Sequence, residues 1–261
     1  MNLEQIHRHW EEAGGKISLI ERVTSTSRDP FLGILEEANI LRHLRGDKSV
    51  LEVGCGDASH TIKYAKHAKF IWATDVAASL IKLAQQRAAS AGTCNIEFCV
   101  GSVLDAGQMF RDMNVDCVIS QRCLINLPSW EHQQEAILNI YELLKPGGVF
   151  LMTEGFQDEL NNVNSLRKAV GLSEINVVSY NRNLQHNEFD AFINRYFTTE
   201  AVHDYGLYLF LSRVYHPLVV LPESPNHDSR LNEVASMLST LVPISSLKKF
   251  SYNLFYVLKK K

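Results

Sequence analysis

The stretch Val50-Leu51-Glu52-Val53-Gly54-Cys55-Gly56-Asp57-Ala58 decides the fold, because it joins a short apolar run to two closely spaced glycines. A second apolar run ends in Asp75, nineteen residues after Gly56. An apolar strand, a glycine turn, a helix and a second strand that ends in an acid are typical of a crevice for a nucleoside. Glycine suits the turn because a side chain there would hold the backbone away from the ligand. The carboxylate of Asp75 can accept hydrogen bonds from both ribose hydroxyls.

Two classes of cofactor use such a crevice, and the turn distinguishes them. A dinucleotide fingerprint has Gly or Ala at its sixth position, where this chain has Ser59. Glu52 instead stands two residues before the first glycine, which gives Glu-x-Gly-x-Gly. This pattern resembles the first motif of the class I S-adenosylmethionine-dependent methyltransferases. A third glycine is common there, and Ala58 is a mild departure because alanine still leaves room. The alternative is a glycine turn of some other α/β protein.

Strand and helix patterns alternate from residue 49 onward. The sequence predicts strands at 49–53, 70–74, 95–99, 115–120 and 148–154, and helices at 58–68, 77–91 and 130–144. Nearly continuous apolar strands separated by helices indicate a parallel sheet that is covered on both faces. Further strands are expected at 197–205 and 250–258, and the resemblance implies that the last one is antiparallel. The expected fold is therefore α/β, Rossmann-like and doubly wound, with a mostly parallel seven-stranded sheet.

The expected organisation is an N-terminal helical lid at 1–45 and a class I methyltransferase domain at 46–261. Acceptor-site insertions, largely helical, are expected at about 157–196 and 206–249, with a Pro-rich loop at 217–225. Leu3, Ile6 and Trp10 recur at helical spacing, and Asp29 before Pro30 is a good N-cap for a second helix. Trp10 and residues 24–28 could cover the cofactor and exclude water. Alternatively, Trp10 only packs its helix onto the domain.

Composition limits the partners. A formal net charge of −3 argues against a nucleic-acid surface, and no apolar run approaches the ~20 residues of a membrane span. The five cysteines form no Cys-x-x-Cys pair, which is typical of reduced thiols in a cytoplasmic protein. The ten histidines lack the spacing of a zinc site, so no metal is expected. We expect a cytoplasmic enzyme with a small-molecule acceptor, no nucleic acid and no membrane; the sequence leaves the oligomeric state open.

The resemblance also assigns residues to the cofactor S-adenosyl-L-methionine. The methionine carboxylate is expected at the first strand's tip and Arg28, the ribose at Asp75, adenine beside Ser102 and Val103, and the sulfonium near Ser120 and Gln121. Asp75 could alternatively cap the helix that follows it. The full set of expected cofactor residues is Glu52, Gly54, Gly56, Asp57, Asp75, Val76, Ser102, Val103, Ser120, Gln121 and Arg28.

Methyl transfer from a sulfonium mainly requires alignment of the nucleophile and exclusion of water. A hydroxyl acceptor must also lose its proton, which calls for a base such as His, Asp or Glu. Glu154 at a strand tip and His216 are the candidate catalytic residues, although each could instead be a structural buried group. Candidate substrate-binding residues are Arg122, Asn126, Tyr180, Asn181 and Arg213.

The hypothesis is a methyltransferase acting on an oxygen, or as second choice a nitrogen, of a small polar metabolite such as a sugar, a surface-glycan precursor or a secondary metabolite. The stretches Met152-Thr153-Glu154-Gly155 and Asn164-Ser165-Leu166-Arg167 are similar to those of a bacterial methyltransferase subgroup associated with such acceptors. The alternatives are a methyltransferase that acts on RNA or protein and a non-catalytic module that binds S-adenosylmethionine.

Overall fold

The computed structural model describes residues 1–16, 29–44, 46–242 and 244–261. In these residues one seven-stranded sheet has the order β3-β2-β1-β4-β5-β7-β6. Strands β1 to β5 are parallel, whereas β7 runs antiparallel to both of its neighbours. The predicted α/β fold and its antiparallel last strand are confirmed. The strands are β1 (Ser49–Val53), β2 (Phe70–Asp75), β3 (Ile96–Val100), β4 (Val115–Gln121), β5 (Leu144–Gly155), β6 (Phe197–Asp204) and β7 (Asn253–Lys260).

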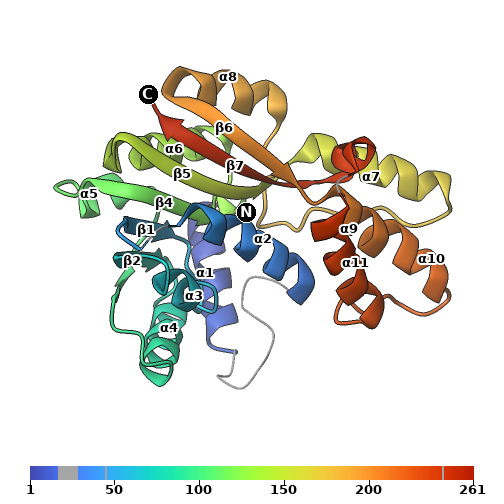
Figure 1. Cartoon of the computed structure of the whole chain (residues 1–261), viewed down its shortest axis with the longest axis horizontal. Coiled ribbons are helices and arrows are strands. Elements are labelled where there is room, and N and C mark those ends of the chain that lie inside the picture. Colours follow the sequence, from blue (N-terminus) through green and yellow to red (C-terminus); the bar gives the residue numbers. More distant parts are fainter. Residues whose placement is uncertain (17–28, 45, 243) are drawn as a thin grey trace.

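Helices cover both faces of the sheet (Figure 1). The helical elements are α1 (Leu3–Gly14), α2 (Pro30–His43), α3 (Thr61–Ala65), α4 (Ala78–Ser90), α5 (Ala106–Met109), η1 (Leu124–Asn126), α6 (Trp130–Leu143), α7 (Gln157–Ala169), α8 (His186–Tyr196), α9 (Gly206–Phe210), η2 (Leu211–Tyr215), α10 (His216–Val220), α11 (Arg230–Leu241) and η3 (Ser245–Phe250).

The core has two halves, one on each face of the sheet. One buried cluster joins the sheet to α5, α6 and α8, and the other joins it to α2, α3, α4, α9 and α11. Alternate residues of β1 serve the two halves: Leu51 and Val53 face the first cluster and Val50 faces the second. Burial on both faces explains why the parallel strands are apolar along almost their whole length.

Local signals set most element boundaries. Asp29 caps α2 by accepting a hydrogen bond from the Leu32 N–H at 3.1 Å, as Asp-Pro predicts. The predicted strand at 148–154 in fact begins at Leu144, directly after α6, and includes Gly147 with φ +72°. The helix predicted at 58–68 is shortened to α3, because Ala58 adopts φ +60° and still belongs to the turn.

The C-terminal insertion is largely helical, as expected, and differs from the sequence prediction in where its helices begin and end. The apolar segment 206–221 folds as three successive helical pieces, α9, the π-helical η2 and α10. Pro217, predicted in a loop, lies in the first turn of α10, where its missing N–H costs little. Within the described residues, no helix combines the length and hydropathy needed to cross a bilayer.

Candidate functional site

The glycine turn after β1 is built for close approach of a ligand. Gly54 has φ +73° and Gly56 has φ +57°, values that L side chains rarely adopt. A Cβ on Gly54 would lie 2.8 Å from the Cβ and Sγ atoms of Cys123. The first glycine is therefore required by both backbone conformation and space.

A cavity of about 230 Å³ opens beside this turn, at the carboxyl ends of β1 to β4. Helix α1 and the link before α8 contribute the rest of its wall through Trp10 and Tyr180. Parallel α/β sheets bind their ligands at this end of the strands. The sequence-predicted residues that line the cavity are Gly54, Gly56, Asp75, Val76, Ser102, Val103, Gln121, Arg122, Asn126, Tyr180 and Asn181.

Asp75 lies at the tip of β2 and touches both the cavity and the glycine turn. Its Oδ2 accepts a hydrogen bond from the Gly56 N–H at 3.0 Å, and its Oδ1 accepts one from the Ala77 N–H at 3.0 Å. Burial raises the pKa of its carboxyl, and these two N–H groups oppose that rise. Asp75 therefore braces the turn and the start of α4 while one side of it faces the cavity.

Three expected cofactor residues lie beneath the turn rather than in the cavity wall. Glu52 is 3% exposed, and burial raises the pKa of its carboxyl to about 7. The Asp57 carboxylate lies 3.3 Å from the Arg87 guanidinium, so its charge is used inside the fold. The Ser120 hydroxyl donates a hydrogen bond to Glu154 at 2.7 Å. Arg28 falls outside the described residues.

A buried carboxylate that the sequence analysis missed organises the tip of β4. Glu36 on α2 is fully buried and accepts hydrogen bonds from Gln121 Nε2 at 2.8 Å and Asn253 Nδ2 at 2.9 Å. Its Oε2 also lies 3.4 Å from Nη2 of Arg122, whose φ of +56° turns the backbone at the end of the strand. The available signal was an acid on the buried face of a helix that also carries Leu32 and Ile40.

Several polar atoms of cavity-lining side chains are buried without a hydrogen bond. Within the described part of the chain these atoms are Arg122 Nε, Asn126 Oδ1 and Asn181 Oδ1. Asn126 Nδ2 already donates to the Arg122 carbonyl at 2.6 Å, which leaves its oxygen available. Buried polar atoms without a protein partner are uncommon, and at a cavity they indicate a polar ligand.

The structure gives Glu154 a different position from the one expected of a base. Its side chain is fully buried and is not among the residues that line the cavity. Oε1 accepts hydrogen bonds from Ser120 and from the N–H groups of Cys123 and Leu124, and Oε2 accepts one from Ile125 N–H at 3.2 Å. Burial raises the pKa of this carboxyl to about 7. The carboxylate shapes the loop after β4, and we no longer assign it to acid–base chemistry.

His216 and Arg213 also lie away from the cavity. His216 is 3% exposed, and its Nδ1 lies 3.1 Å from Asn232 Oδ1 on α11. Arg213 Nη2 donates to Asp29 Oδ2 at 2.5 Å, and so ties η2 to the start of α2. Both side chains hold the C-terminal insertion together. For His216 this is the structural role that the sequence analysis gave as the alternative to catalysis.

Helix α1 supplies cavity residues; the sequence analysis had proposed Trp10 as part of a lid over the cofactor but had assigned no role in the site to Leu3, Ile6 or His7. Leu3, Ile6, His7 and Trp10 form one helical face along the cavity. The Tyr180 ring stacks on His9 at 4.2 Å and meets Trp10 edge-on at 5.5 Å. The lining position of Trp10 accords with the expected lid, and the 24–28 segment lies outside the described residues.

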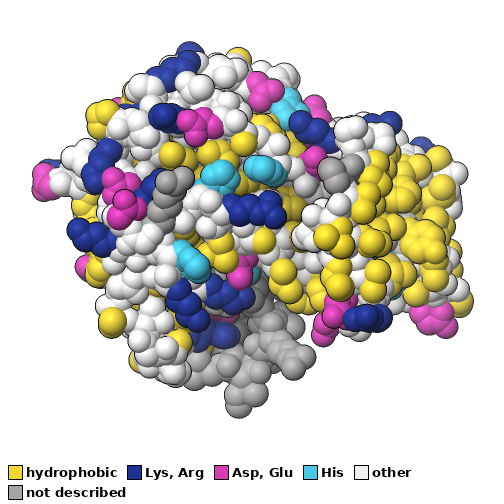
Figure 2. Space-filling view, in the orientation of Figure 1, with side chains coloured by type: hydrophobic (Ala, Val, Ile, Leu, Met, Phe, Trp, Pro, Cys, Tyr) yellow, Lys and Arg dark blue, Asp and Glu magenta, His cyan; other side chains and the backbone are white. Residues whose placement is uncertain are grey.

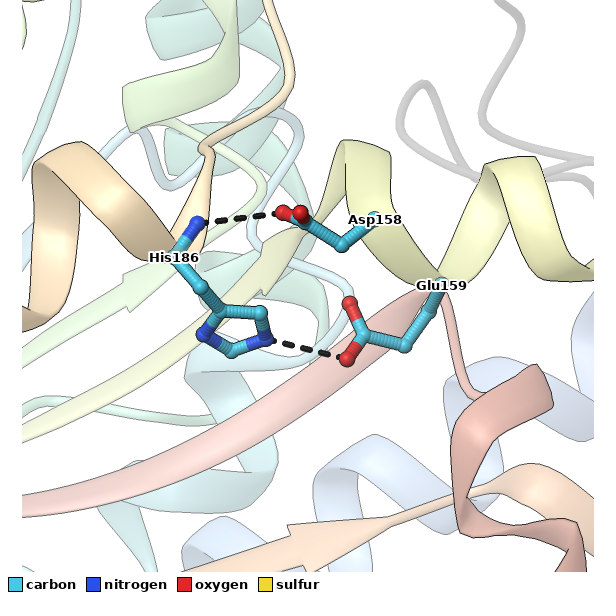
Figure 3. Close-up of side chains that lie close together, drawn as sticks. All are labelled: Asp158, Glu159 and His186. Atoms are coloured by element: carbon cyan, nitrogen blue, oxygen red, sulfur yellow. Dashed lines mark hydrogen bonds and ion pairs between the residues drawn. The ribbon is translucent and has the colours of Figure 1, made fainter.

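A separate cluster on α7 and α8 holds Asp158, Glu159 and His186, whose ligand atoms lie within 4.8 Å of one another (Figure 3). His186 Nε2 lies 2.9 Å from Glu159, and the His186 N–H donates to Asp158 at 3.0 Å. The Glu159 hydrogen bond, with Asp190 also nearby, raises the pKa of His186 to about 9. In the described structure these contacts are those of an ion pair that fixes the start of α8.

Comparisons with known proteins agree with this architecture. Residues 50–148 match the family model described as a methyltransferase domain. The tRNA N(3)-methylcytidine methyltransferase of Schizosaccharomyces pombe is 32% identical over 149 residues, which are 53% of this chain and 46% of that protein. The chain thus spans less than half the length of this curated relative.

Solved structures share the fold at low identity. The N-methyltransferase NodS from Bradyrhizobium japonicum, solved with S-adenosyl-L-homocysteine, has a TM-score of 0.57 and 14% identity over 98% of both chains. Phosphoethanolamine N-methyltransferase 1 from Haemonchus contortus has a TM-score of 0.62 and 14% identity over 98% of this chain and 48% of its own. The family match assigns residues 50–148 to a methyltransferase domain, and the whole chain has the fold of these two N-methyltransferases, both solved with S-adenosylhomocysteine.

Proposed function

We propose that the chain transfers a methyl group from S-adenosylmethionine to a hydroxyl oxygen, or as second choice a nitrogen, of a small polar metabolite such as a sugar or surface-glycan precursor. The observation that carries this proposal is the cavity behind α1, whose unpartnered polar atoms include one amide oxygen each on Asn126 and Asn181. Amide oxygens accept hydrogen bonds from hydroxyls, and the Arg122 guanidinium donates them. Such a set of groups suits an acceptor that carries several hydroxyls.

The residues at this cavity fit the cofactor. The open glycine turn at Gly54 and Gly56 would receive the methionine end, Asp75 the ribose, and Ser102 and Val103 the adenine. When bound, the cofactor supplies a methyl group on a sulfonium. The fit is supported by the positive φ angles of both glycines and by the cavity-facing side of a carboxylate that is 9% exposed.

The size of the cavity supports a small acceptor. Its volume of about 230 Å³ would have to hold the cofactor as well, which leaves little room for a bulky acceptor. Trp10 and Tyr180, which touch each other, both form part of its wall. A bulky macromolecular acceptor would therefore have to displace α1, whereas a small metabolite needs a smaller adjustment.

A hydroxyl acceptor needs a proton acceptor, and His7 is the best placed. The other titratable side chains that line the cavity in the described residues are Asp75, Arg122, Cys123 and Tyr180. Both Asp75 oxygens already accept backbone hydrogen bonds, and burial raises the pKa of the Cys123 thiol. Arginine cannot accept a proton, and a neutral phenol is a weak base. We therefore assign general-base catalysis to the imidazole of His7.

A second function, methylation of RNA, has one observation in its favour. The 32% identical relative from Schizosaccharomyces pombe is named a tRNA methyltransferase. The formal charge of −3 opposes this function, because binding to phosphates is driven largely by lysine and arginine.

We place the reaction in the cytoplasm, in keeping with the five free cysteines.

Two experiments test these proposals. In calorimetry, Asp75→Ala should abolish binding of S-adenosylmethionine, whereas the exposed Asp112→Ala should bind it normally. Unchanged affinity of a folded Asp75→Ala variant would refute the ribose assignment.

In a separate experiment, cofactor with an isotopically labelled methyl group is incubated with the enzyme and either a low-molecular-weight metabolite fraction or total tRNA. Label in the metabolites supports the first function, and label confined to tRNA replaces it with the second.

A further inference from the structure

The far C-terminal helices expose a large apolar surface. Among the described residues, ten of the seventeen large apolar side chains that are exposed fall between residues 215 and 244. Figure 2 shows a broad yellow area of hydrophobic side chains over α10 and α11. We name this area the α10–α11 surface; it consists of Tyr215, Leu218, Val219, Leu221, Val234, Met237, Leu238, Leu241, Val242 and Ile244.

Helix α11 has a buried side that packs on the core and an exposed side that is also apolar. Its core side is formed by Asn232, Ala235 and Ser236, which are buried. Its outer side carries Met237 at 55% exposure and Leu241 at 73%. A helix on the surface of a monomer normally places polar residues outward, so an apolar outer side indicates a partner.

The charges around the surface identify the partner. Glu223 and Asp228 are exposed before the start of α11, whereas Lys248 and Lys249 are exposed after its end, in η3. Arg230, at the first residue of α11, is ion-paired with Glu233, so the net charge at this end stays negative. If two copies pair with their α11 helices antiparallel, the acidic end of each copy meets the basic end of the other. A two-fold interface requires such self-complementarity.

The composition of the surface disfavours a lipid bilayer as its partner. Helices that lie on membranes combine an apolar face with a lysine- and arginine-rich polar face, often with Trp or Phe. The α10–α11 surface has one aromatic residue, Tyr215, and Glu223 and Asp228 at one end would be repelled by anionic lipid headgroups. Aliphatic side chains at the centre with charges of both signs at the ends are typical of a homodimer interface.

We propose that the α10–α11 surface is the interface of a two-fold symmetric homodimer, in which α11 packs antiparallel to its copy. None of the residues that line the cavity beside Gly54 belongs to this surface. The inference is independent of the acceptor and of the methyl-transfer reaction.

Sedimentation velocity of the whole chain tests the interface. The wild type should sediment at micromolar concentration with twice the 29.5 kDa mass of one chain. Met237→Glu together with Leu241→Glu should give a monomer with an unchanged far-ultraviolet circular dichroism spectrum. The control is Met109→Glu, at an exposed apolar residue on α5 at the opposite end of the sheet, and it should remain dimeric (Figure 1).

A charge exchange gives a second readout that does not depend on altering the apolar centre. Reversal of Lys248 and Lys249 to Glu should weaken the dimer at least about tenfold at low salt, because like charges then face each other. Further reversal of Glu223 and Asp228 to Lys should restore it. A monomeric wild type at submillimolar concentration overturns the proposal. If the wild type is a monomer that floats with anionic vesicles, and if the variant with Met237→Glu and Leu241→Glu no longer floats, the surface binds membranes and the homodimer proposal is overturned.

Discussion

The Arg213–Asp29 ion pair yields the prediction whose magnitude the structure defines best. The Arg213 and Asp29 side chains are only 12% and 5% exposed, and Asp29 also accepts hydrogen bonds from Tyr208 at 2.6 Å and the Leu32 N–H. We predict that Arg213→Met destabilises the protein by about 3–5 kcal/mol, because it removes a guanidinium that is ion-paired with a buried carboxylate. At roughly 2–4 °C per kcal/mol for a chain near this size, Tm should fall by about 6–20 °C.

The pH dependence supplies an independent check of the same pair. Burial would raise the pKa of Asp29, but Arg213, Tyr208 and the Leu32 N–H together hold it below its usual value. A lowered pKa in the folded state stabilises the protein above the unfolded value of 3.8, and this contribution is lost as pH falls through the folded value. Arg213→Met should therefore begin to unfold in acid at a higher pH than the wild type.

A double-mutant cycle with Asp29→Asn decides whether the effect belongs to the pair. Denaturant unfolding of the wild type, both single variants and the double variant gives the coupling, and the double variant should be more stable than Arg213→Met alone. Calorimetry should find S-adenosylmethionine affinity unchanged in every folded variant, since neither residue lines the cavity. Arg213→Met with the stability of the wild type but no acceptor turnover would refute this reasoning and return Arg213 to the substrate site.

Three further predictions concern the site and the ion-pair cluster. His7→Gln should lower kcat by about 10²–10⁴-fold for a hydroxyl acceptor while cofactor affinity in calorimetry stays within a few-fold, and an unchanged pH–rate profile would exclude the base assignment. The pKa of His186 is raised to about 9, so its ion pair contributes fully to the free energy of unfolding below pH 6.5, and this contribution is lost as pH rises through 9. Because this ring is partly buried, the loss in unfolding free energy should be about 1–2 kcal/mol after solvent screening. Urea unfolding across this pH range should show that loss in the wild type and not in His186→Asn. Gly54→Ala should cost more than the ~1–2 kcal/mol of left-handed strain alone, because its Cβ meets Cys123, whereas Gly92→Ala, at φ +65° in open space, should cost the strain only. Equal thermal shifts in the two glycine variants would argue against the steric contact.

Sequence patterns predicted the sheet well because its physical causes are local. The central strands β1, β2 and β4 are short, largely apolar runs, and Asp29-Pro30 marks the start of α2 through its own capping chemistry. The glycine turn was equally readable, since positive φ angles restrict Gly54 and Gly56 to glycine. The boundaries that were missed, such as the early start of β5 at Leu144, depend on pairing with β4 across the sheet.

The polar site residues were harder to predict, because a sequence does not reveal which way a side chain points. Glu154 does end a strand as predicted, yet its carboxylate accepts hydrogen bonds from the β4 loop inside the fold. His7 carried no motif, and it reaches the cavity only because α1 packs against α4, more than sixty residues away in the chain. The pairing of Arg213 with Asp29 likewise joins residues 184 positions apart, a separation at which no local pattern operates.

The position of β7 between β5 and β6 has a consequence for synthesis on the ribosome. Strand β6 hydrogen-bonds only to β7 within the sheet, so residues 197–204 have no partner strand until residues 253–260 have been translated. At about 5–20 residues per second, a nascent chain holds this unfinished edge for several seconds. During that interval β5 also exposes a ladder to which a foreign strand could anneal. Chaperone demand should therefore be greatest while residues 205–253 are being translated.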